Sequence, residues 1–205
     1  MRSLKKRFER WYGKLPENSR FMVDLVREKV VPVFLARGFV WTDDYALGKS
    51  TEVGTNEIVL QLREGDGWPT VQIFFSPGGK PWFCIDFGLI SDGAYRYDGR
   101  VVNKQEATIN QASIRLSLAK TKGTVRSLFT QFGYHYFSFS PKKKTTAEVE
   151  YALSLLPVIF DLFENGIPNE WKNIKNAYAS QNVYKFFRPD FESMHSKDGI
   201  AMRPQ

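Results

Sequence analysis

The stretch "NEIVLQLREGDGWPTVQIFFSPGGKPWFCIDFGLI", residues 56–90, carries the clearest structural signal of the chain. Apolar and polar residues alternate in its first part, which places Ile58, Leu60 and Leu62 on one face of a strand. "GDGW" and "PGGKP" predict tight turns, because glycine tolerates positive φ and aspartate stabilises a bend. The last nine residues are apolar on both faces and predict a central strand. With a fourth strand expected at residues 39–47, these segments indicate an antiparallel meander.

Helical patterns lie on both sides of this meander. Residues 18–38 have apolar side chains at helical spacing, with Asn18 as the candidate N-cap and Gly38 at the position that favours a left-handed residue. Pro32 is expected to kink the last turns because it has no amide hydrogen. A short basic helix is expected before this one, at about residues 3–12.

Two helices are predicted near the C-terminus. The first begins at Thr145, whose spacing to Glu148 fits a capping box, and ends at Gly166. The second is "NEWKNIKNAYASQ", residues 169–181, which has apolar side chains along one side of a helix.

The segment between the meander and these helices gives mixed signals. Residues 103–120 have moderate helical character, residues 124–131 fit a strand or a helix, and "YHYFSFS", residues 134–140, predicts a strand from its β propensity. The predicted fold is therefore α+β. An antiparallel sheet of about five strands carries an N-terminal helix and a C-terminal helix pair packed on it. We expect one domain over residues 1–188, with a polar tail at 189–205.

Basic charge is concentrated in two parts of this chain of net charge +7. Residues 1–37 hold ten Lys or Arg against four Asp or Glu, and residues 101–144 hold eight against one. The predicted sheet region, residues 38–100, is acidic, with five against nine. Such basic segments attract nucleic acid or acidic protein surfaces.

Three consecutive lysines lie just before the helix predicted at Thr145, where the helix macrodipole disfavours cations. A solvated turn would explain them, with Glu148 and Glu150 offsetting the charge. Free amides beside the lysines would equally form an anion site. The predicted anion or partner-binding residues are Lys142, Lys143, Lys144, Lys120, Lys122 and Arg126. Tyr134 and Tyr136 are the candidate aromatic contacts.

Groups suited to catalysis are few. A nucleophile pair of Cys84 and His135 needs only spatial proximity, but a buried Cys84 and a hydrogen-bonded His135 are the simpler interpretation. Asp86 is a carboxylate inside an apolar strand, and it would need partners if buried. One cysteine and two distant histidines, His135 and His195, cannot form a zinc site. We predict no catalytic residue, no metal and no cofactor.

The same composition bears on the compartment. A single cysteine excludes an internal disulfide framework and favours a reducing cytoplasm. No apolar run reaches the roughly 18 residues that a membrane span needs. The basic N-terminus lacks the apolar stretch of a signal peptide. We therefore expect a cytoplasmic protein without a membrane partner.

Nucleic-acid binding is an alternative function. "GYHYFSF", residues 133–139, resembles the RNA-contacting strand of the RNA-recognition motif, matching at Gly133, Tyr134, Tyr136 and Phe139. His135 stands where that pattern has a small residue. A final strand of the motif is also replaced by a predicted helix. In this alternative, the basic 101–144 stretch and the aromatic strand would form the binding surface.

The order of signals also resembles a bacterial family, domain-of-unknown-function family four-three-zero-four. The shared features are Gly38–Phe39, Gln61, Phe83 to Gly88, and Gly166 to Pro168. The resemblance covers about Phe21 to Ala179. Members of this family are suspected of acting in toxin immunity or defence, which implies a non-enzymatic binding protein with a protein partner. The resemblance provides no catalytic residue.

Overall fold

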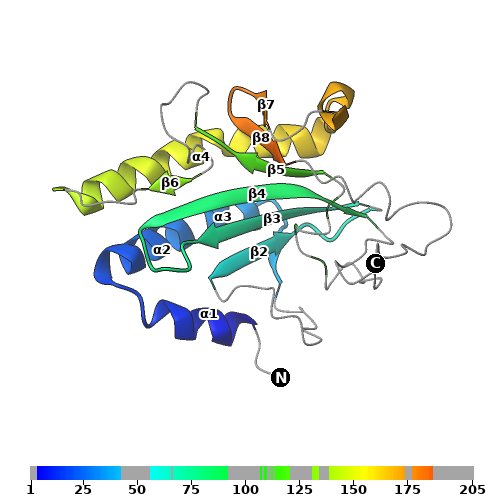
Figure 1. Cartoon of the computed structure of the whole chain (residues 1–205). Coiled ribbons are helices and arrows are strands. Elements are labelled where there is room, and N and C mark those ends of the chain that lie inside the picture. The colour runs from blue at the N-terminus through cyan, green and yellow to red at the C-terminus, as the bar shows by residue number, and fades with distance from the viewer. Residues whose placement is uncertain are drawn as a thin grey trace, which may run out of the picture.

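The fold is α+β, with one antiparallel sheet of eight strands in the part of the chain that is described. The computed structural model describes residues 4–42, 56–65, 67–91, 107, 109, 112, 114–120, 131–133, 139–173 and 177–186. Helices pack against the sheet, as Figure 1 shows. The predicted class and antiparallel sheet are thus confirmed, whereas the sheet has more strands than the five expected. No helix in the described ranges combines the length and apolarity of a membrane span.

The sheet begins with the predicted meander. Its strands are β1 (Val40–Trp41), β2 (Glu57–Gln61), β3 (Gly67–Phe75), β4 (Trp82–Ser91), β5 (Arg115–Leu118), β6 (Phe132–Gly133), β7 (Ala177–Ser180) and β8 (Val183–Phe186). The spatial order is β1-β2-β3-β4-β5-β8-β7, and β6 also pairs with β4. Of the fifth predicted strand, residues 134–140, only Phe139 and Ser140 are described, and neither lies in a strand. Gly133, the first residue of the RNA-recognition pattern, belongs to β6.

The helices begin and end differently from the prediction. They are α1 (Leu4–Tyr12), α2 (Glu17–Lys29), α3 (Val31–Leu35) and α4 (Pro141–Asn165). The first long helix begins after Pro16 rather than at an Asn18 cap, since the fixed φ of proline already suits a helix entry. The expected kink at Pro32 is a break between α2 and α3 at Val30. Gly38 has φ 84°, as its predicted position requires.

The predicted C-terminal helix pair is wrong in its second member. Residues Asn169–Asn173 form a short 3₁₀ helix, and β7 and β8 then make a hairpin. The helical prediction for residues 103–120 is likewise wrong at Arg115–Leu118, which form β5. In this strand Leu116 and Leu118 face the helices and Ser117 faces away. β5 and β8 pair with each other over four residues. Pairing between segments distant in the chain has overridden local helical spacing.

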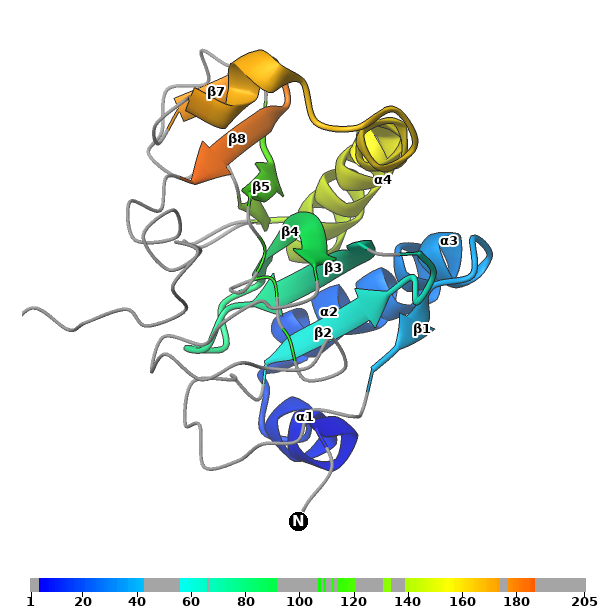
Figure 2. The ribbon, with the colours of Figure 1, turned by 90° about the vertical axis from the view of Figure 1, so that its right-hand side faces the viewer.

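One hydrophobic core joins the inner face of the sheet to the helices, and Figure 2 shows this layer end-on. The inner face is formed by Ile58, Leu60, Val71, Ile73, Phe75, Phe83, Ile85, Phe87, Leu116 and Leu118. α1 joins this core through Phe8, whose ring lies 6.1 Å from that of Phe75 and 5.9 Å from that of Trp41. The sheet thus has one face committed to the helices.

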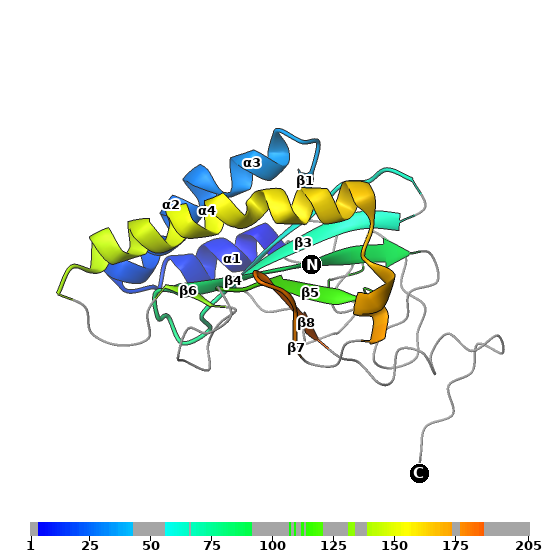
Figure 3. The same cartoon turned by 90° about the horizontal axis from the view of Figure 1, so that it is seen from above.

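α3 continues from the end of α2, and the two helices run beside α4 in the same direction, as Figure 3 shows from above. Three ion pairs join residues 17–37 to α4, and their partners follow the same order along both segments. They are Lys142–Glu17 at 3.1 Å, Lys29–Glu150, and Arg37–Glu164 at 3.3 Å. The parallel arrangement brings the N-termini of α2 and α4 to the same end of the molecule.

Candidate functional site

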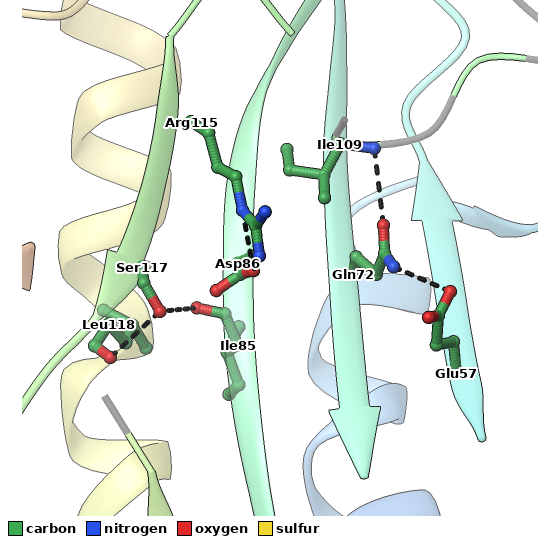
Figure 4. Close-up of polar contacts among 8 residues, drawn as sticks. All are labelled: Glu57, Gln72, Ile85, Asp86, Ile109, Arg115, Ser117 and Leu118. Atoms are coloured by element: carbon green, nitrogen blue, oxygen red, sulfur yellow. Dashed lines mark hydrogen bonds and ion pairs between the residues drawn. The ribbon is translucent and has the colours of Figure 1, made fainter. Parts of the chain in front are cut away.

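A row of polar side chains crosses the outer face of the sheet, away from the helices (Figure 4). Gln72 of β3 lies opposite Asp86 of β4, Asp86 lies opposite Ser117 of β5, and Ser117 lies opposite Tyr184 of β8. Gln72, Asp86 and Ser117 are buried. Buried polar groups need hydrogen-bond partners, so their contacts decide whether the row is structural or reactive.

Asp86 has a cationic partner in this row. The Arg115 guanidinium donates through Nε, at 3.0 Å, and through Nη2 to the same carboxylate oxygen of Asp86. The Asp86 side chain is 6% exposed and that of Arg115 is 27% exposed. The expectation that a buried Asp86 needs partners is therefore confirmed. An ion pair of this kind is costly to break from one side, because it leaves a buried charge behind.

The two glutamines of the outer face hold another segment of the chain. Gln72 Nε2 donates to Glu57 Oε2 at 2.7 Å, and the amide of Ile109 donates to Gln72 Oε1 at 3.4 Å. Gln61 Nε2 donates to the carbonyl of Ala107 at 3.3 Å. Ala107, Ile109 and Ala112 also form a small apolar cluster with Ile90. We call residues 107–114 the covering segment, of which 107, 109, 112 and 114 are described.

Gly88 lets the covering segment lie directly on β4. A Cβ added at Gly88 would be 2.9 Å from the Cβ of Ala112, and closer still to the carbonyl oxygen of Ile114. Real Cβ atoms do not approach that closely, so only glycine fits here. Gln72 of the polar row, together with Gln61, therefore holds the covering segment against the sheet.

The other candidate reactive groups, a cysteine and two histidines, form no cluster among the described residues. Cys84 is half-buried on β4, and His135 and His195 lie outside the described ranges. No group of three or more His, Cys, Asp or Glu that could hold a metal ion occurs in the described part of the chain.

The lysine run lies inside α4 rather than before it. The helix begins at Pro141, so Lys142, Lys143 and Lys144 occupy its first turn. Proline is favoured at this position because its φ is already helical and its missing amide hydrogen is not needed there. The side chain of the N-cap residue, Ser140, makes no capping hydrogen bond.

The predicted Thr145–Glu148 capping box is therefore wrong. Thr145 is fully buried in the helix, and its hydroxyl oxygen has no hydrogen-bond partner. Glu148 instead binds Lys120, with 2.7 Å between Nζ and Oε2, and accepts the amide hydrogen of Gly133 at 3.2 Å. Glu148 thus joins α4 to the end of β5 and to β6, and Lys120 is committed to this joint.

The lysine run is part of a larger basic surface. α4 and α2 begin side by side, and the turn between β3 and β4 lies at the same end, to the left in Figures 1 and 3. The Ser19 hydroxyl of α2 donates to the carbonyl of Gly79 in that turn. Six exposed cations lie there, and together we call them the basic end: Lys14, Arg20, Lys80, Lys142, Lys143 and Lys144.

The predicted aromatic contacts leave out Phe139, although the RNA-recognition pattern matches it. Phe139 is 96% exposed and lies two residues before α4. Its strand-like context, "YHYFSFS", indicated alternation but did not indicate which face would be open. Among the other predicted site residues, Lys122, Arg126, Tyr134 and Tyr136 lie outside the described ranges.

Lys142 is already engaged at the basic end. Its ammonium lies 3.1 Å from Glu17 Oε1 and 5.7 Å from the centre of the Phe21 ring. Both partners of this ion pair are largely exposed, at 59% and 75%. Exposed pairs are weak, so a strongly anionic partner could replace Glu17.

Comparisons with known proteins identify no relative. No family model, no curated protein and no solved structure matches the chain. The resemblance to family four-three-zero-four stays a prediction based on the residues quoted above.

Proposed function

We propose that this protein works by binding an acidic macromolecule at the basic end, and performs no chemistry on it. One observation carries the proposal. Three consecutive lysines occupy the first turn of α4, next to a phenylalanine that is 96% exposed.

The helix terminus itself gains nothing from lysines in its first turn. A helix N-terminus carries partial positive charge, so each cation in the first turn costs about 0.3–1 kcal/mol relative to a favourable charge. Residues that oppose stability on an exposed surface are typical of binding sites. The positive end of α4 and its lysines would add their attraction for an anionic partner.

Binding without chemistry is supported by the polar row. Its carboxylate, Asp86, is engaged by Arg115, and the neighbouring carboxylate of Glu57 is engaged by Gln72. The resemblance to family four-three-zero-four supports placing such a binding protein in bacterial toxin immunity or defence. This setting is part of the proposal.

Charge reversal at Lys143 tests the proposal. Lys143→Glu is expected to elute from immobilised heparin, a general polyanion, at lower salt than the unchanged protein. It should also raise the free energy of unfolding by about 0.3–1 kcal/mol, because an anion suits the helix N-terminus. Weaker binding with higher stability cannot come from unfolding.

Arg37→Glu is the matched control. It makes the same change in net charge at the opposite end of the helix layer, where Arg37 contacts Glu164. The proposal expects a smaller shift in elution salt for Arg37→Glu than for Lys143→Glu. Equal shifts would show that only net charge matters, and the basic end would not be a site.

A further inference from the structure

We infer that the basic end binds single-stranded nucleic acid, with Phe139 as the stacking platform for one base. This inference rests on the proposed function and names the class of its partner. Sites for single strands combine cations that contact the phosphate backbone with exposed aromatic rings on which bases stack. Both parts are present at the start of α4.

The exposure of Phe139 favours a base over a protein side chain. Three large hydrophobic residues are exposed among the described residues, namely Leu35, Val40 and Phe139. Leu35 ends α3 and Val40 begins β1, so both lie near the C-terminal end of the α2–α3 pair. Of these three, Phe139 is the one at the basic end. A single exposed ring is enough to stack one base.

The basic end contains mostly lysine rather than arginine, which also favours nucleic acid over protein as the partner. Five of the six residues of the basic end are lysines, and Arg20 is the single arginine. Interfaces between proteins are depleted in lysine and enriched in arginine. A phosphate backbone can be neutralised by lysines as point charges without bidentate geometry.

We expect a single strand rather than a duplex, because the base that stacks on Phe139 must be unstacked from its neighbouring bases. The ring of Phe139 can stack only on a base whose face is open, and a duplex hides the faces of all internal bases. Stacking is also tolerant of sequence, since every base has a flat aromatic face. We therefore expect little preference among bases.

Fluorescence anisotropy with a labelled oligothymidine of about 15 nucleotides tests the inference, because that length covers a site of the usual size. Phe139→Ala is expected to weaken binding by roughly 5- to 150-fold, the equivalent of one lost stacking contact. Phe139→Trp should retain it. Leu35→Ala, which removes an exposed apolar side chain elsewhere, should leave it unchanged.

Poly-L-glutamate and a duplex of the same length separate the outcomes. If Lys143→Glu weakens oligothymidine binding and Phe139→Ala does not, stacking is refuted while binding of acidic macromolecules stands. If the duplex binds as tightly as oligothymidine, the inferred preference for a single strand is refuted. If poly-L-glutamate binds as tightly as oligothymidine, the nucleic-acid inference is refuted and an acidic protein is favoured. If neither variant weakens binding to any polyanion, the proposed function fails as well.

Discussion

Asp86 and Arg115 form an ion pair between β4 and β5 on the outer face of the sheet, and the pair is more buried on the acidic side. The carboxylate is 6% exposed and the guanidinium 27% exposed. Asp86 lies opposite Ser117 of β5, and Arg115 is two residues before Ser117 on the same strand. Removing the arginine would therefore leave a charge in a place that water barely reaches.

Arg115→Met is expected to lower the free energy of unfolding by about 3 kcal/mol, because it leaves the Asp86 carboxylate buried without its cation. Urea denaturation measures this loss. The double variant Asp86→Leu with Arg115→Met should recover most of it, since replacing both partners by apolar groups is often neutral. If the double variant is no more stable than Arg115→Met, the buried charge is not the cause.

Gly88→Ala is expected to destabilise the protein by about 1–3 kcal/mol, because the new methyl group would overlap the covering segment. Thermal or urea unfolding measures the change. Gly67→Ala is the control in the neighbouring strand, where an added Cβ would lie 4.0 Å from the Cβ of Leu89. A loss in Gly67→Ala as large as that in Gly88→Ala would contradict the close approach of Ala112 and Ile114.

The meander could be predicted because its information is local. The apolar side chains at every second residue around β2 and the glycines of two tight turns indicate which face packs on the core and where the chain reverses. β5 and the β7–β8 hairpin could not be predicted in this way. Their strands are only four residues long, and the pairing of β5 with β8 joins segments that are far apart in the sequence.

The candidate site could be predicted only in part. The lysine run was recognised from its charge, but the capping-box spacing of Thr145 and Glu148 concealed the true start of α4 at Pro141. The partners of Glu148 are Lys120 and Gly133, which no local pattern indicates. The exposure of Phe139 depends on what surrounds it in three dimensions, which alternation alone does not indicate.

Thr145→Val is expected to stabilise the protein by about 1 kcal/mol, because it removes a buried hydroxyl that has no hydrogen-bond partner and keeps the side-chain shape. The midpoint and slope of urea unfolding give this value. Thr146→Val is the control one residue later, where the hydroxyl donates to the carbonyl of Lys142 at 2.9 Å. Thr146→Val should give no gain, and a gain of equal size would mean that valine itself suits this part of α4.

Tyr12 should ionise at a higher pH than an ordinary tyrosine. Its hydroxyl donates to Asp24 at 2.6 Å, and this hydrogen bond, with burial and the Asp24 charge, raises the pKa of Tyr12 above 10.0. Arg27 and Arg20 oppose the shift. Because the folded state holds the proton more tightly, this contribution to stability is present below about pH 10 and is lost as pH rises through the folded pKa.

Asp24→Asn is expected to bring the pKa of Tyr12 back toward 10.0, since it removes the negative charge beside the phenol. Absorbance at alkaline pH, taken as the difference from Tyr12→Phe, isolates this one phenol among the nine tyrosines of the chain. A titration of Tyr12 that is the same in Asp24→Asn and in the unchanged protein would contradict the assignment.

The parallel pairing of α2 with α4 also has a consequence for how the chain is made. Lys29 and Glu150, which join these helices, are 121 residues apart in sequence. A ribosome releases α2 and the meander long before α4, and contacts between distant segments form late. Until α4 emerges, Met22, Val26 and the adjoining inner face of the sheet lack their cover. The nascent chain is therefore most prone to aggregation in that interval, and a chaperone would be most useful to it then.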